Sequence, residues 1–150
     1  MNITSLLNDQ SILIPLDVND KNAAIDALAG ALAESGAVTD KAAYLEALHA
    51  RENTGSTGIG FGVAIPHGKS SGVAQAALAF AKFASPIDWQ SLDGEPVSAA
   101  FMIAVPEEAA GNDHLKILIA ISRKLIDDEF REQLLAVEDS AQLKELLGAI

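Results

Sequence analysis

The sequence has no cysteine, one tryptophan and one tyrosine, and its 150 residues include only 10 basic side chains against 21 acidic ones. The absence of cysteine excludes disulfides, catalysis by a thiolate and metal sites built on cysteine. The formal net charge of −11 disfavours nucleic acid and anionic lipid, because both are negatively charged. We therefore expect a protein partner with a basic face rather than a nucleic acid.

Long apolar runs are also missing, so no segment has the length of a membrane-spanning helix. Residues 1–10 lack the basic region and apolar core of a secretory signal, and we expect a cytoplasmic protein. Hydrophobic residues nevertheless make up 49% of the chain and the mean hydropathy is +0.23, which favours a compact fold over disorder. Since no linker, repeat or low-complexity tract interrupts the sequence, we expect one domain over residues 1–150.

Hydrophobic periodicity predicts strands that alternate with helices. The expected strands cover residues 12–16, 63–65, 76–83 and 97–105, and the expected helices cover residues 20–36, 40–51 and 112–126, followed by two that begin near 127 and 140. The strand over 97–105 should be buried on both faces, and the helix over 112–126 should be central and mostly buried. The predicted fold class is α/β: a single-domain sandwich with a mixed central β-sheet covered by helices on both faces.

The stretch GIGFGVAIPHGK, residues 58–69, ends a short apolar run with a histidine, His67. Val63–Ile65 have the pattern of the last buried residues of a strand, and Pro66 has no N–H to donate to a neighbouring strand. We therefore expect the chain to leave the sheet at its rim and to expose His67. The surrounding glycines let another backbone or a phosphate approach the imidazole. The alternative is a histidine with only a surface or structural role.

Three other residues become candidates if they lie near His67. His114 opens the helix predicted over 112–126, where unsatisfied N–H groups and the helix dipole favour a bound anion. Arg51 ends the preceding predicted helix, and its guanidinium suits bidentate contacts with phosphoryl oxygens; its alternative role is a cation at a helix C-terminus. Thr57 has a hydroxyl to donate, or is simply a loop residue. Trp89 is interpreted as a packing residue.

Several chemistries do not fit these residues. The glycine spacing matches neither the dinucleotide fingerprint nor a phosphate-binding loop, so we expect no nucleotide and no cofactor. HExxH and a nearby acidic ligand are missing, which leaves zinc on the two histidines only as an alternative, and G-x-S-x-G is missing as well. Phosphoryl transfer through a histidine fits best, because a neutral imidazole nitrogen is a good nucleophile and neighbouring donors stabilise the phosphoryl charge.

Two segments, RENTGSTGIGFGVAIPHGK and PEEAAGNDHLKILIAISRKLID, closely resemble the phosphotransferase-system (PTS) enzyme IIA domain of the fructose-mannitol type, including its nitrogen-regulatory relatives. The resemblance covers nearly the whole chain and implies an α/β sandwich with a mixed sheet. It implies that His67 accepts a phosphoryl group from the phosphocarrier protein HPr and passes it to a cysteine of enzyme IIB, which phosphorylates sugar during uptake. It also implies that His114 and Arg51 stabilise the phosphoryl group and that Thr57 contributes a hydroxyl.

The resemblance indicates the family but does not distinguish a role in transport from a role in regulation. The segments GNDHLKIL and IDWQSLDGEPV are more similar to fructose-type transport components, whereas separate chains of this length are also typical of nitrogen-regulatory paralogues. We favour transport, with HPr and enzyme IIB as partners and the membrane reached only through enzyme IIC. The alternative is a regulator that binds proteins according to its phosphorylation state. We expect HPr to dock over an apolar rim with Phe61 and Val63.

Overall fold

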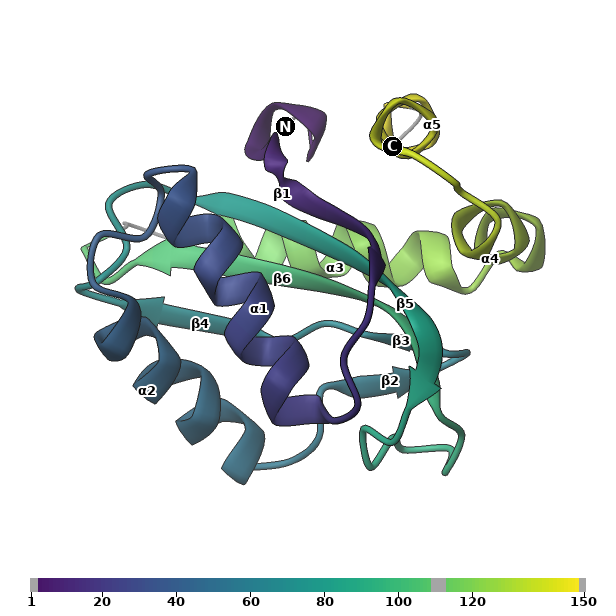
Figure 1. Ribbon diagram of the computed structural model, residues 1–150, viewed down its shortest axis with the longest axis horizontal. Helices are drawn as coiled ribbons and strands as arrows, with labels where there is room; N and C mark the ends of the chain where they lie inside the picture. The colour runs from purple at the N-terminus through teal and green to yellow at the C-terminus, as the bar shows by residue number, and fades with distance from the viewer. Residues whose placement is uncertain (1–2, 109–112, 149–150) are drawn as a thin grey trace.

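A mixed β-sheet forms the centre of the molecule (Figure 1). The computed structural model describes residues 3–108 and 113–148, and for residues 113–115 the backbone only. The strands are β1 (Leu7–Leu16), β2 (Gly58–Gly60), β3 (Val63–Ala64), β4 (His67–Ser70), β5 (Ala77–Ile87) and β6 (Val97–Pro106). Their order is β1-β5-β6-β3-β2, and β4 also pairs with β6. The pairs β5–β6 and β2–β3 are antiparallel and the others are parallel, which confirms the predicted mixed sheet.

Helices cover both faces of this sheet, as the sequence predicts (Figure 1). They are α1 (Lys21–Glu34), α2 (Lys41–Asn53), α3 (Asp113–Leu125), α4 (Asp128–Leu135) and α5 (Ser140–Leu147), preceded by a 3₁₀ turn at Ile3–Leu6. One hydrophobic core lies between the sheet and α1 and α2, and a second lies between the opposite face and α3, α4 and α5. Within the described ranges, no helix combines the length and the apolar character needed to cross a membrane.

Strand β6 contributes to both cores because its successive side chains point to opposite faces of the sheet. Ala100, Met102 and Ala104 belong to the core under α1 and α2, whereas Phe101 and Ile103 belong to the core under α3, α4 and α5. The prediction that this strand is buried on both faces is therefore confirmed. Strands β1 and β5 are longer than their apolar patterns indicated, since pairing carries them into flanking polar residues.

Aspartate side chains cap several of the helices at their N-termini. Asp20 and Asp40 each accept a hydrogen bond from the backbone N–H three residues later, at 2.7 Å and 3.2 Å, and Asp127 accepts one from the N–H two residues later at 3.0 Å. Each carboxylate thereby satisfies a free N–H group in the first turn of its helix. The last helix begins at Ser140, near its predicted start, and Asp139 caps it.

Helix α3 lies on the surface and is not the central, mostly buried helix that its apolar content suggested. Ile117, Ile121 and Leu125 are buried, but Lys116 and Ile119 are exposed. The buried side chains are four residues apart and therefore share one face of the helix. The sheet covers this face of the helix, whereas the apolar residues described on its other sides are exposed or only partly buried. The apolar content of the helix therefore overstates its burial.

Tyr44 connects α2 to the sheet through a buried hydrogen bond. Its side chain is fully buried, and its hydroxyl donates to the carbonyl oxygen of Ile103 at 2.8 Å. Burial raises the pKa of the Tyr44 phenol well above its ordinary value of about 10, because the phenolate would lose its hydration. Ile103 is the residue of β6 that pairs with His67, so this bond lies directly behind the first residue of β4.

We expect Tyr44→Phe to lower the free energy of unfolding by about 1 kcal/mol at neutral pH, because one buried hydrogen bond is lost. The folded protein keeps the phenolic proton at a pH where the unfolded chain releases it, so Tyr44 loses stabilising effect as the pH rises above about 10. Urea unfolding from pH 7 to 11 should therefore show the gap between wild type and variant closing at the alkaline end. A gap that stays constant across this range would contradict the shifted pKa.

Candidate functional site

His67 is the first residue of a strand. Strand β3 ends at Ala64, and pairing with β6 resumes at His67, opposite Ile103. Pro66 has no N–H, but its carbonyl oxygen accepts from the N–H of Ile103 at 3.0 Å, so the chain stays in the sheet. The prediction that the chain leaves the sheet here is therefore wrong, and His67 is half-buried rather than fully exposed. It still lies on a short strand whose pairing, in the described part of the chain, is with β6.

Gly68, the next residue, allows α2 to lie directly on β4. A Cβ at this position would be 3.3 Å from Cε1 of Tyr44 and 3.4 Å from Cβ of Ala47. These distances are shorter than ordinary contacts between carbon atoms, so a side chain would push the helix away. Because α2 runs so close to the strand, its last turn brings Arg51 to His67.

Within the described part of the chain, a hydrogen bond at each ring nitrogen orients the imidazole of His67. Nδ1 donates to the carbonyl oxygen of Ile65 at 2.9 Å, and it must be the donor because a carbonyl oxygen can only accept. In the neutral ring, Nε2 then carries the lone pair. Nε of Arg51 donates to this atom at 3.3 Å. The ring nitrogen that carries the lone pair therefore faces a permanent positive charge.

The guanidinium of Arg51 is held from a second side as well. Its Nη1 donates to the carbonyl oxygen of Gly55 at 2.8 Å and to Oγ1 of Thr54 at 3.2 Å. Thr54 in turn donates to the carbonyl oxygen of Arg51 at 2.7 Å. The turn that follows α2 thus fixes the guanidinium of Arg51. The sequence left two roles open for this residue, a contact with phosphoryl oxygens or a positive charge at a helix C-terminus.

Thr57 is buried, and its hydroxyl is already engaged. It accepts a hydrogen bond from Nε1 of Trp89 at 3.1 Å and donates its proton to a carboxylate oxygen of Glu52. The same carboxylate accepts from the backbone N–H of Thr57 at 3.3 Å. In this arrangement the hydroxyl proton points to Glu52, so Thr57 positions Glu52 instead of presenting a donor at His67. Trp89 is fully buried, in agreement with a packing role.

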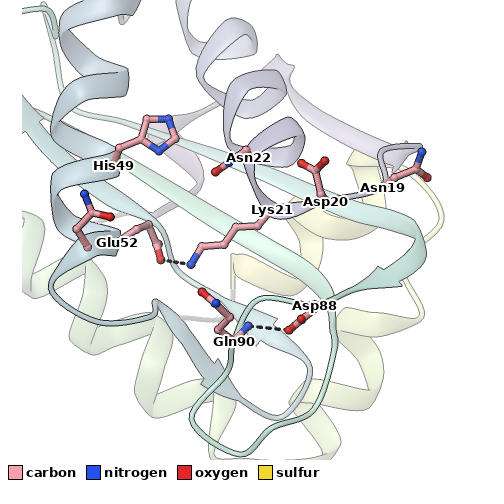
Figure 2. Close-up of a pocket in the computed structure, with 9 residues that line it drawn as sticks. Asn19, Asp20, Lys21, Asn22, His49, Glu52, Asp88 and Gln90 are labelled. Carbon is pink, nitrogen blue, oxygen red and sulfur yellow. Dashed lines mark hydrogen bonds and ion pairs between the residues drawn. The ribbon is translucent and has the colours of Figure 1, made fainter.

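A polar pocket of about 420 Å³ opens behind this turn, between the start of α1, the end of α2 and the loop after β5 (Figure 2). On its wall, Nζ of Lys21 pairs with Glu52 at 2.6 Å. Asp88 accepts a hydrogen bond from the backbone N–H of Gln90 at 3.0 Å on the opposite side. His49, the third histidine of the chain, projects from α2 into the same pocket and is exposed.

A second depression, also of about 420 Å³, adjoins the imidazole. Its lining consists of Ala47, Ala50, Arg51, His67, Gly68, Lys69 and Val105. A small anionic group that entered it would meet a nucleophilic nitrogen and a guanidinium together. This combination suits phosphoryl chemistry, because a permanent cation stabilises the charge on phosphoryl oxygens.

His114 is the second residue of α3, as the sequence predicts, and its side chain lies outside the described part of the structure. Residues 109–112, which precede this helix, lie outside the described residues too. Among the residues that the structure describes, no cluster of three or more histidine, aspartate or glutamate side chains is arranged to hold a metal ion.

The apolar rim predicted for a partner is only half present. Phe61 is 51% exposed at the turn between β2 and β3, where its backbone has a positive φ of 62°. The guanidinium of Arg131, from α4, lies 4.2 Å above the centre of its ring. Val63 is fully buried, so the expectation that it contributes to this rim is wrong; it points into the core under α3.

The sequence singled out Arg51 as a candidate partner of His67, on the condition that the two lie close together, but it gave no sign of Lys21 and Glu52. No local signal could have joined these two, because an ion pair between residues of different helices depends on how the helices pack. The position of Glu52 beside Arg51 was visible, but a carboxylate at the end of a helix is usually solvated.

In comparisons with known proteins, the chain matches one family. The family model described as "Phosphoenolpyruvate-dependent sugar phosphotransferase system, EIIA 2" matches residues 5–149. The chain is 38% identical to a PTS system fructose-specific EIIA component from Haloferax volcanii, over 96% of this chain and 97% of that protein. It is 40% identical to a nitrogen regulatory protein from Bradyrhizobium diazoefficiens, over 99% of this chain and 95% of that protein.

Some relatives are much longer than this chain. A PTS system fructose-specific EIIABC component from Bacillus subtilis is 39% identical over 99% of this chain, which spans only 23% of that protein. Among solved structures, the nitrogen regulatory protein IIA-Ntr from Neisseria meningitidis superposes with a TM-score of 0.89 at 35% sequence identity. The match covers 97% of this chain and 98% of that one.

We expect the neutral imidazole of His67 to carry its proton on Nδ1, because the carbonyl oxygen of Ile65 can only accept. Long-range ¹H–¹⁵N correlation spectra, recorded at a pH above the imidazole titration, distinguish the two tautomers. In Arg51→Ala the proton should remain on Nδ1, while the Nε2 resonance shifts because its donor is gone. A neutral ring protonated on Nε2 would contradict the hydrogen-bond assignment.

Proposed function

Because the chain belongs to the family of phosphoenolpyruvate-dependent sugar phosphotransferase system EIIA 2 domains, which transfer phosphoryl groups, we propose that it is a phosphocarrier that uses His67. In this proposal residues 1–150 form one EIIA domain. The observation that carries the proposal is the position of Nε2 of His67, with its lone pair facing Arg51 beside an open depression. No cofactor takes part in the proposed transfer.

The proposed reaction begins with attack of Nε2 on phosphorus. The bond from phosphorus to the donor's imidazole nitrogen breaks as the new P–N bond forms, and the donor imidazole leaves with the electron pair. The ring of His67 becomes a phosphoimidazolium, whose proton stays on Nδ1 and donates to the carbonyl oxygen of Ile65. The same hydrogen bond that orients the free ring therefore stabilises the positive charge in the phosphorylated one.

Arg51 acts on the phosphoryl group in this proposal. Its Nε–H occupies the lone pair of His67 in the free protein and must leave it when phosphorus approaches. A phosphoryl oxygen then takes over as the acceptor, so the guanidinium changes partner without moving far. Because Thr54 and Gly55 hold Nη1, the cation is oriented before the substrate arrives, which is the condition for strong electrostatic stabilisation.

His114 is proposed to support the phosphoryl group without carrying it. Its place in the first turn of α3 is supported by the backbone, and the N-terminus of a helix favours a bound anion. We propose hydrogen bonding and charge stabilisation as its role. Thr57, by contrast, is proposed to act through Glu52.

We propose HPr as the phosphoryl donor and enzyme IIB as the acceptor. The net charge of −11 supports a donor with a basic face, since opposite charges speed association at low salt. Phe61 supplies an exposed aromatic side chain near which such a partner can dock. Transfer onward to a cysteine of enzyme IIB would place the protein in the uptake of a fructose- or mannitol-type sugar.

A second candidate role is regulation by phosphorylation state. The match to IIA-Ntr with a TM-score of 0.89 and the 40% identity to a nitrogen regulatory protein favour it. The 38% identity to a fructose-specific EIIA component of similar length favours transport. Both roles use the same phosphorylated histidine, so they differ only in the partner that follows.

We expect phosphorylated HPr to label this protein once, on His67, without a nucleotide or an added metal ion. Mass spectrometry should locate an acid-labile, base-stable adduct on that residue. Label should be lost in His67→Ala and kept in His49→Ala, a matched control because His49 is exposed on the helix that carries Arg51. Label that persists in His67→Ala would overturn the assignment.

The same assay separates the nucleophile from its support. His114→Ala should still be labelled on His67, but its single-turnover rate should fall about 10- to 1,000-fold if it contributes like one preorganised donor. Circular dichroism would exclude misfolding. If His114→Ala abolished labelling while His67→Ala retained it, the proposed roles would be reversed.

The role after phosphorylation depends on the acceptor. If the protein serves transport, we expect it to transfer its phosphoryl group rapidly to a cysteine-bearing enzyme IIB domain for a fructose- or mannitol-type sugar. Panels of IIB domains tested in one phosphotransfer assay would measure this directly. The serine variant of the acceptor cysteine is the control for each domain. If no IIB domain accepts the group while the labelled protein still binds a regulatory target, the transport role is wrong.

A further inference from the structure

We propose that Glu52 is a positioning residue for Arg51, and that Lys21 holds Glu52 in place. This inference rests on the proposed phosphocarrier function. Glu52 directly follows Arg51 in the last turn of α2, yet its side chain turns away from the imidazole and is only 7% exposed. Three hydrogen-bond donors converge on its carboxylate: the backbone N–H of Thr57, the hydroxyl of Thr57 and Nζ of Lys21.

These contacts fix both ends of the turn that holds the guanidinium. At one end, the N–H of Gly55 donates to the carbonyl oxygen of Glu52 at 3.1 Å, and at the other end Thr57 is tied to the Glu52 side chain. Between them, the carbonyl oxygen of Gly55 accepts from Nη1 of Arg51. A shift of this turn would therefore move one of the acceptors that orient the arginine.

The turn after α2 contains a glycine, so contacts from Glu52 are needed to hold it in one conformation. Gly55 has a φ of 151°, and a glycine at this point gives the turn a wide choice of backbone conformations. Arginine also has a long side chain with many rotamers, so fixing it costs conformational entropy. Ordering the turn before the phosphoryl group arrives removes part of that cost from the transfer step.

The hydrogen bond between the Thr57 hydroxyl and the Glu52 carboxylate has a defined donor, which is Thr57. Nε1–H of Trp89 donates to this hydroxyl, so the oxygen acts as acceptor there and its own proton is left for Glu52. Lys21 completes the arrangement from the start of α1, where its Nζ pairs with Glu52 (Figure 2). The same Nζ lies 5.8 Å from the centre of the Trp89 ring. The ion pair forms part of the wall of the polar pocket, and neither Lys21 nor Glu52 lines the depression at His67, so a substitution here removes no side chain from that depression.

The test is a double-mutant cycle between Glu52 and Arg51, read by single-turnover phosphorylation of His67. Glu52→Gln keeps the size of the side chain but removes its charge and places an amide NH₂ among donors, so either a contact breaks or the Thr57 hydroxyl must turn its proton away from residue 52. We expect it to slow transfer about 3- to 30-fold in the wild-type background and less than about 2-fold in Arg51→Ala, because residues that act through one another are not additive. Lys21→Met should act in the same direction with a smaller factor.

Asp26→Asn is the matched control. Asp26 pairs with Lys41 at 3.3 Å, and this pair also joins α1 to α2, but it is exposed and distant in sequence from the turn. We expect its transfer rate to stay within about 2-fold of wild type, as is usual for an exposed pair. Circular dichroism and a measurement temperature well below unfolding restrict the comparison to folded protein.

A slowing by Glu52→Gln that is equal with and without Arg51 would overturn the proposal, because the residue would then act through general stability. No slowing at all would overturn it as well. A readout independent of transfer is the exchange of the Nε–H of Arg51 with solvent, followed by NMR. It should speed up at least about 5-fold in Glu52→Gln if the turn loosens. If wild type is not labelled on His67, the phosphocarrier function fails, while this exchange measurement still decides whether Glu52 positions Arg51.

Discussion

Helix α2 and strand β4 approach each other so closely that two glycines are needed between them. A Cβ at Gly68 would lie 3.3 Å from Tyr44, and a Cβ at Gly72 would lie 2.4 Å from the carbonyl oxygen of Asp40, at the start of the helix. These two contacts fix the distance of α2 from the sheet at both ends of the strand. Because the helix is held at this distance, its last turn delivers both Arg51 to the imidazole of His67 and Glu52 to Lys21.

Much of the fold could be predicted because it depends on local chemistry. Asp20, Asp40 and Asp127 cap helices because a carboxylate satisfies free N–H groups wherever a helix starts, and this needs no knowledge of the rest of the chain. The burial of β6 on both faces follows from its continuous apolar run. Helix α3 was misjudged because apolar content alone does not say how many faces a neighbour covers. Strand β4 was missed because the sequence HGKS has no strand pattern, and only pairing with β6 makes it one.

The part of the site that could be predicted is the part whose chemistry depends on the type of a single residue. A histidine after a proline and an arginine before a glycine-rich stretch pointed to His67 and Arg51, and the structure brings the two together at 3.3 Å. The direction in which Thr57 donates was not predictable, since a hydroxyl can rotate towards any acceptor. It depends on Glu52 and Trp89, which reach Thr57 from two other parts of the chain. Tertiary packing therefore decides which of the candidate donors are free to act.

The two ends of the sheet limit how this protein can hold another one. Strand β1 is an outermost strand with Pro15 in it and with irregular pairing to β5, and β2, at the other end, has three residues of which two are glycine. Short or proline-bearing edges offer few well-placed backbone groups to a visiting strand, so they disfavour extension of the sheet by a partner. This leaves side chains as the main source of contacts with a partner, and side-chain contacts of limited area can be released quickly. The sheet edges thus favour brief encounters, with a short residence time for each partner and many exchanges of partner per molecule.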